Sequence, residues 1–148
     1  MSGSRVAQIS VPSDSHSIAI ARRFVSQILA DLAWVTPAMV DDVRLVASEL
    51  VTNAVRAQRR VDDSATIAIR AAGFDDRFEL TVVDHGGGFE VDTSALRLPD
   101  AHIDREGGFG LPLISALTDE IHVVSAADGA EVRVVVYRDR ASAPTRSA

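Results

Sequence analysis

The sequence has 148 residues, a hydrophobic fraction of 47% and a formal net charge of −6, which suits one compact domain and excludes general disorder. It contains no cysteine, which excludes disulfides and thiolate sites and is compatible with a reducing compartment, so we expect a cytoplasmic protein. The acidic charge disfavours direct binding to nucleic acid, and no apolar run is long enough to span a membrane.

The first half of the chain predicts one strand followed by two helices. Residues 5–11 alternate weakly and end at a proline, which is typical of a short edge strand. Residues 13–15 offer N-caps for a helix that should stop near Trp34. Thr36 followed by Pro37 predicts the start of a second helix, because a cap followed by an N1 proline is a strong start signal.

The second half predicts two hairpins, separated by a long loop and a short helix. The loop covers residues 85–110, has no convincing period, and is longer than compact domains usually tolerate unless it is functional or mobile. The helix follows it at residues 111–117. Four strands are expected, at residues 66–70, 78–83, 121–125 and 131–137.

This order of elements predicts an α+β sandwich, in which helices cover one face of a mostly antiparallel, mixed sheet. No repeat or internal linker interrupts it, so residues 1–138 form one predicted domain. Residues 139–148 are expected to be a disordered tail.

Two polar residues of the second predicted helix are candidates for a shared site. Glu49 and Asn53 lie four residues apart and therefore project from one helix face. An asparagine oxygen suits Mg²⁺, and a carboxylate one turn away could take a proton from an attacking hydroxyl. Alone, the pair more often marks an exposed polar stripe, so it needs further residues to indicate a site.

A second candidate is Asp84, which closes a predicted strand in phase with apolar residues and is followed by Gly86, Gly87 and Gly88. Its carboxylate should point into the core layer, where it needs a donor such as the amino group of adenine. The glycines would let the backbone approach a flat base closely. An ordinary turn capped by Asp84 is an equally good interpretation of this segment alone.

The third candidate is the run from Arg105 to Gly110, in which Gly108, Phe109 and Gly110 lead directly into a helix. Free N–H groups at a helix start can bind phosphates, and Arg105 could add a charged contact. All fifteen basic residues are arginine, so a Walker A lysine is excluded, and a phosphate site must use Mg²⁺, backbone N–H groups or arginine.

In this order, the three segments resemble the GHKL ATPase superfamily, and within it the anti-sigma-factor serine kinases of the RsbW/SpoIIAB type. The N box resembles residues 49–54, the first glycine box residues 84–88, and the second residues 108–110. The similarity runs from about Val6 to Tyr137 and implies a Bergerat-type ATP-binding fold.

The resemblance also implies roles for these residues. Glu49 would be the general base, Asn53 would bind Mg²⁺, and Asp84 would recognise the adenine of ATP. The glycines at 86, 88, 108 and 110, with Phe109 and Arg105, would shape the nucleotide pocket and its lid. The implied partners are an anti-anti-sigma protein of the STAS fold, which is phosphorylated on Ser or Thr, and a sigma factor that is held inactive. The chain could also form a homodimer.

Two departures from the family pattern leave alternatives open. Gly129 is followed by Ala130, where some GHKL proteins have threonine, and Pro112 lies in the first turn of the helix after the loop. The chain could therefore be a non-catalytic anti-sigma module that uses nucleotide only as a conformational ligand. An ATPase without a protein substrate is a third alternative. Arg56, Arg59 and Arg60 are interpreted as a solvated face.

Overall fold

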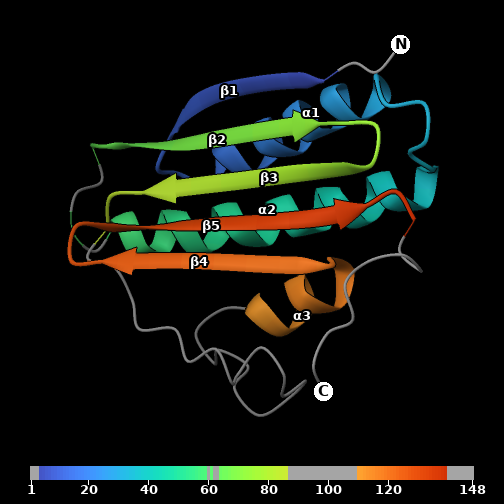
Figure 1. The fold of residues 1–148 in the computed structure, drawn as a ribbon. Helices are drawn as coiled ribbons and strands as arrows, with labels where there is room; N and C mark the ends of the chain where they lie inside the picture. The colour runs from blue at the N-terminus through green and yellow to red at the C-terminus, as the bar shows by residue number, and fades with distance from the viewer. Residues whose placement is uncertain (1–3, 60, 62–63, 87–109, 140–148) are drawn as a thin grey trace.

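The computed structural model describes residues 4–59, 61, 64–86 and 110–139, which form two layers (Figure 1). The front layer in Figure 1 is a five-stranded sheet in the order β1-β2-β3-β5-β4, and each of its four pairings is antiparallel. The elements in chain order are β1 (Arg5–Pro12), α1 (His16–Ala30), α2 (Pro37–Arg59), β2 (Thr66–Gly73), β3 (Arg77–Asp84), α3 (Gly110–Leu117), β4 (Glu120–Ala126) and β5 (Gly129–Tyr137).

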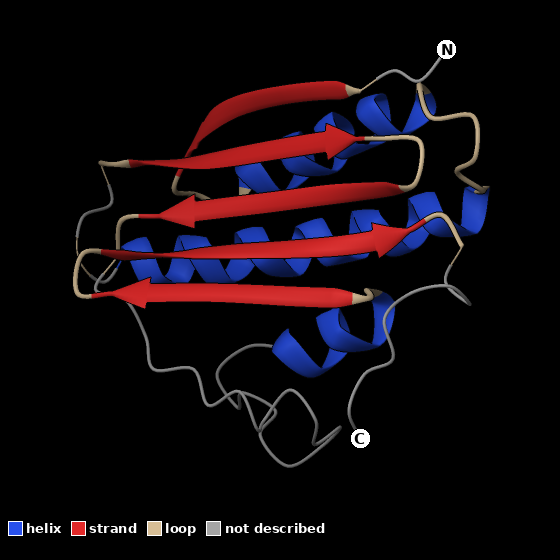
Figure 2. Ribbon diagram, in the orientation of Figure 1, coloured by secondary structure: helices blue, strands red, loops and turns tan. Residues whose placement is uncertain are grey.

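All three helices cover the same face of the sheet, so the predicted α+β sandwich is confirmed (Figure 2). The longest helix, α2, runs behind β3 and β5, with α1 on one side of it and α3 on the other (Figure 1). The sheet was expected to be mixed, whereas the described pairings are all antiparallel. Within the described parts of the chain, no helix has the length and apolar character that a membrane crossing needs.

Period-two alternation directs the apolar residues of the strands towards the helices. In β3 the side chains of Phe78, Leu80 and Val82 are buried in one core cluster with residues of α1 and α2. Asp84 is also buried and continues this phase, as the sequence predicted. The strand therefore delivers a carboxyl group to the helix side of the sheet at its C-terminal end.

The helices α1 and α2 start where the sequence predicted, although Ser15 at the N-cap of α1 makes no side-chain cap hydrogen bond. The end of α1 does not fall where it was expected. Thr36 caps α2, since its hydroxyl oxygen accepts from the N–H of Met39 at 3.2 Å. The helix α1 ends at Ala30 rather than near Trp34, because the N–H of Leu32 closes a tight turn onto the carbonyl of Leu29 at 3.0 Å. Trp34 lies beyond the helix and donates its indole N–H to the carbonyl of Phe74 at 2.8 Å.

Candidate functional site

Asp84 is the buried carboxyl group at the centre of the candidate site. Only 5% of the residue is exposed, and its Oδ1 accepts from the N–H of Gly86 at 2.9 Å. The backbone N–H of Ala130, its partner on β5, is a second donor. Burial raises the pKa of Asp84 above its ordinary value, and these two N–H groups and the nearby His85 offset only part of that rise. The carboxylate keeps acceptor capacity for a further donor.

Two glycines hold the backbone around Asp84 in contact with its neighbours. A Cβ atom on Gly86 would lie 2.6 Å from the carbonyl oxygen of Ala57, so the turn after β3 rests directly on α2. Gly129 has a φ of 154°, and a Cβ atom there would lie 2.2 Å from the carbonyl oxygen of Asp84. The end of β3 is therefore confined between α2 and the turn that joins β4 to β5.

The contact at Ala57 brings the two predicted halves of the site together. Ala57 lies one helical turn beyond Asn53 and two turns beyond Glu49 on α2. The helix places both polar residues on one face, as predicted, while Leu50 is buried against the sheet. Asp84, Asn53 and Glu49 therefore belong to one region of the fold.

Glu49 and Asn53 are half-buried and differ in their surroundings. Burial raises the pKa of Glu49 above its ordinary value of 4.5, and the positive charge of Arg56 offsets part of that rise. Asn53 makes no side-chain hydrogen bond to another described residue, so its amide oxygen is available to a ligand. A hard amide oxygen fits Mg²⁺, which needs few protein ligands because phosphate oxygens and water complete its shell.

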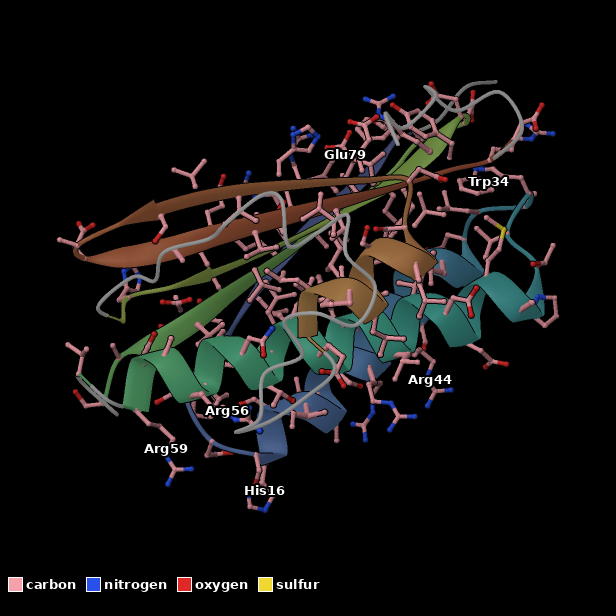
Figure 3. All side chains as sticks on the ribbon, turned by 90° about the horizontal axis from the view of Figure 1, so that it is seen from below. His16, Trp34, Arg44, Arg56, Arg59 and Glu79 are labelled. Carbon is pink, nitrogen blue, oxygen red and sulfur yellow. The ribbon has the colours of Figure 1, made fainter. Side chains whose placement is uncertain are left out.

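Arg56 is a residue that sequence reasoning assigned to a solvated face and that the structure places differently. It lies on α2 one turn beyond Asn53, and Figure 3 shows it on the helix side of the molecule. Its NH1 atom is buried and has no hydrogen-bond partner among the residues that the structure describes. A buried guanidinium nitrogen without an acceptor is costly and suits an anion bound beside it.

Gln58 is a residue of the site that was not predicted from the sequence, and Gly129 makes a contact there that the sequence did not predict. Gln58 is fully buried and accepts from the N–H of His85 at 2.9 Å. A signal for it existed, because Gln58 continues the buried stripe of α2 that passes through Ala54. From the sequence, Gly129 was named only as the residue before Ala130, since its contact with Asp84 is made across the sheet.

Of the second predicted glycine segment, the structure describes only the last residue. Gly88, Arg105, Gly108 and Phe109 lie outside the described residues. Gly110 is the first residue of α3, so the second glycine segment leads into a helix as predicted. Among the residues that the structure describes, no group of three or more His, Asp or Glu side chains could hold a metal ion. A cation at Asn53 would thus take most of its ligands from the nucleotide and water.

Comparisons with known proteins agree with this fold. Residues 11–136 match the family of histidine kinase-like ATPase domains. The serine-protein kinase RsbW of Bacillus subtilis is 31% identical over 122 residues, which cover 78% of this chain and 76% of the relative. The serine-protein kinase RsbW of Bacillus velezensis is 29% identical over 136 residues, which cover 88% of this chain and 84% of the relative.

A solved structure supports the fold. The crystal structure of the RsbU and RsbW domains of Rv1364c from Mycobacterium tuberculosis superposes with a TM-score of 0.67 at 20% identity. The match covers 89% of this chain and 32% of that chain. At this identity the likeness shows the shared architecture.

The chain belongs to the family of histidine kinase-like ATPase domains, and the use of ATP follows from that membership. Its curated relatives place it, more narrowly, with the serine-protein kinases of the RsbW type. The predicted superfamily and the predicted class of protein kinase are both confirmed.

Replacing Asp84 by asparagine should have distinct effects on ATP affinity and on the free energy of unfolding. The amide oxygen of the Asp84→Asn variant can still accept from the backbone N–H groups. Its NH₂ group could not accept from the amino group of a bound adenine, so we expect ATP affinity to fall about 10- to 100-fold. Because the pKa of Asp84 is raised in the folded state, its ionisation lowers the free energy of unfolding as pH rises above 3.8. The stability of Asp84→Asn relative to wild type should therefore increase as pH rises.

Urea unfolding of both proteins from about pH 4 to neutrality measures that difference. Glu131→Gln is the control, because Glu131 is an exposed carboxyl group on β5 next to Ala130. A constant difference between Asp84→Asn and wild type across this range would contradict the raised pKa.

Proposed function

We propose that this chain is an ATP- and Mg²⁺-dependent anti-sigma factor that phosphorylates a serine or threonine of an anti-anti-sigma protein of the STAS fold. In the same proposal it sequesters a sigma factor and acts in the cytoplasm. The observation that supports it is the contact between Gly86 and Ala57, which brings the buried carboxyl group of Asp84 towards the helix face of Glu49 and Asn53. The predicted homodimer stays a prediction.

Each residue has a distinct part in the proposed reaction. Asp84 accepts from the exocyclic amino group of adenine, which satisfies a buried carboxylate that has only two backbone donors. Asn53 holds Mg²⁺, which supplies positive charge to the phosphate oxygens. Arg56 adds a guanidinium group beside them, in a chain that has no lysine.

Glu49 is proposed as the general base for the protein substrate. The hydroxyl oxygen of the substrate attacks the γ-phosphorus, its proton passes to the Glu49 carboxylate, and ADP leaves with the electron pair of the broken bond. Burial makes Glu49 a stronger base than an exposed glutamate, because it raises the pKa. Arg56 lowers that pKa again and so favours the ionised form that can accept a proton.

One observation favours the non-catalytic alternative. Ala130 is 4% exposed and pairs directly with Asp84, so its methyl group occupies the place of the threonine found in some relatives. The hydroxyl contact that such a threonine could offer beside Asp84 is missing. Absence of Mg-ATP binding at millimolar nucleotide in calorimetry would exclude the kinase. If Mg-ATP binds, phosphate transfer to a cognate STAS protein separates the kinase from a module that only binds nucleotide.

Removing the Glu49 carboxylate should stop phosphate transfer and leave nucleotide binding intact. With labelled ATP and a cognate STAS protein, Glu49→Ala should transfer phosphate at least about 100-fold more slowly, because a positioned base contributes that much. Its affinity for Mg-ATP should stay close to that of wild type. Asp41→Ala is the matched control, an exposed carboxyl group on the same helix. Equal transfer by Glu49→Ala would refute the proposed base.

The role of Asn53 should appear in the dependence of ATP affinity on Mg²⁺. Wild type should bind ATP more tightly with Mg²⁺ than with a chelator. Asn53→Ala should reduce this gain by about tenfold or more, since even an outer partner of a metal ligand contributes that much. Gln27→Ala, which removes an exposed amide of α1, should keep the full gain. If Asn53→Ala retained the wild-type response to Mg²⁺, the metal would be held elsewhere.

Arg56 should set the pH range in which Glu49 works. Transfer requires ionised Glu49, so the rate should decrease as pH falls through its raised pKa. In Arg56→Gln the charge that lowers this pKa is absent, and the decrease should begin at higher pH. Transfer rates measured across pH should show no such displacement for Arg59→Gln, an exposed arginine of the same helix end. Identical profiles for Arg56→Gln and wild type would argue against the coupling.

A further inference from the structure

The side chain of Gln58 joins three separate segments of the chain. It is fully buried near the C-terminal end of α2. Its Nε2 donates to the carbonyl of Ala65 and, at 3.4 Å, to the carbonyl of Thr66, where β2 begins. Its Oε1 accepts from the N–H of His85 at 2.9 Å, just after β3 ends. The amide therefore connects α2 to one end of each of two neighbouring strands.

These partners require an amide and fix its orientation. Two backbone carbonyl groups need a donor, and the His85 N–H needs an acceptor. A glutamine side chain supplies both, and the reverse orientation would place oxygen against oxygen. An apolar side chain could fill the same volume but would leave a buried N–H and two carbonyl groups unpaired, which costs stability.

The hydrogen bond from His85 gives Gln58 a role beyond packing, because it joins the helix to the turn that follows Asp84. His85 lies between Asp84, the base-recognition carboxyl group, and Gly86, which touches α2 at Ala57. The N–H of Gly86 in turn donates to Asp84 at 2.9 Å. In α2, which the structure describes from end to end, Gln58 is the one polar side chain among the buried positions. The polar group is placed where the helix meets the turn.

We propose that Gln58 is a positioning residue for nucleotide, which holds the turn of Asp84 to Gly86 against α2 and thereby sets the preference for adenine over guanine. Adenine offers an amino group to the Asp84 carboxylate, whereas guanine has a carbonyl oxygen at that position and would be repelled. Discrimination of this kind requires a carboxylate that cannot move away. The inference rests on the proposed function, because it assumes that Asp84 receives the base.

The test measures ATP and GTP affinities of the full chain carrying Gln58→Met, which keeps a similar shape and cannot form these hydrogen bonds. Wild type should bind ATP more tightly than GTP. Gln58→Met should lose about tenfold in ATP affinity, because the Asp84 carboxylate is no longer held towards the amino group of adenine. GTP affinity should change little, because the released carboxylate also repels guanine less. Val51→Ala is the control, because it removes buried volume from the same helix without touching the turn. It should preserve the ratio of the two affinities.

A second variant keeps the inference testable if Gln58→Met does not fold. A buried glutamic acid, while protonated, has one donor and one acceptor and imitates much of the amide. Gln58→Glu should therefore share the ATP preference of wild type while the acid is protonated, and lose that preference relative to wild type at the same pH when the acid ionises. Wild type measured at each pH accounts for Asp84, whose pKa is also raised by burial.

The possible results distinguish the two proposals. If wild type binds no ATP, the proposed function fails. If wild type binds ATP and Gln58→Met retains both affinity and preference, or loses ATP and GTP affinity equally, the role of Gln58 is overturned while the proposed function stands.

Discussion

The contact between Gly86 and Ala57 is the constraint on which the rest of the site depends. At this point the turn after β3 approaches the backbone of α2 so closely that any side chain at position 86 would overlap a carbonyl group. The turn therefore cannot move towards the helix, and the bond from His85 to Gln58 prevents it from moving away. Asp84, one residue before His85, takes its position relative to Asn53 from this contact.

Carboxylates on the outer face of the sheet and on its helix side differ in their hydrogen-bond partners and charged neighbours. On the outer face, which Figure 3 shows opposite the helices, Glu79 accepts from Arg77 at 2.7 Å and from Arg133 at 3.1 Å. On the helix side, Asp84 accepts from two backbone N–H groups, and the charge of Arg56 lowers the pKa of Glu49. Glu79 is thus paired with two arginines, whereas burial raises the pKa of Asp84 and of Glu49, a property that is common at ligand-binding sites.

What could be predicted from the sequence depended on local periodicity. The helical period placed Glu49 and Asn53 on one face, and strand alternation placed Asp84 on the inner side, because both patterns are set by neighbouring residues. Gln58 meets His85 across 27 residues, and no local rule connects them. The same applies to Gly129, which touches Asp84 only because β5 is the sheet neighbour of β3. Strand order had to be known before these contacts could be inferred.

Strand order also determines how this chain can vary its nucleotide affinity without changing its fold. Because β3 lies between β2 and β5, Asp84 has Ala130 beside it, and the turn before Ala130 must carry a glycine to pass its carbonyl group. A change at position 130 alters the wall beside Asp84, whereas a change at position 129 or 86 forces the backbone to move. In the proposed function, a change at position 130 would alter how tightly the base is held, while the two glycines and Gln58 maintain the position of the turn beside Asp84.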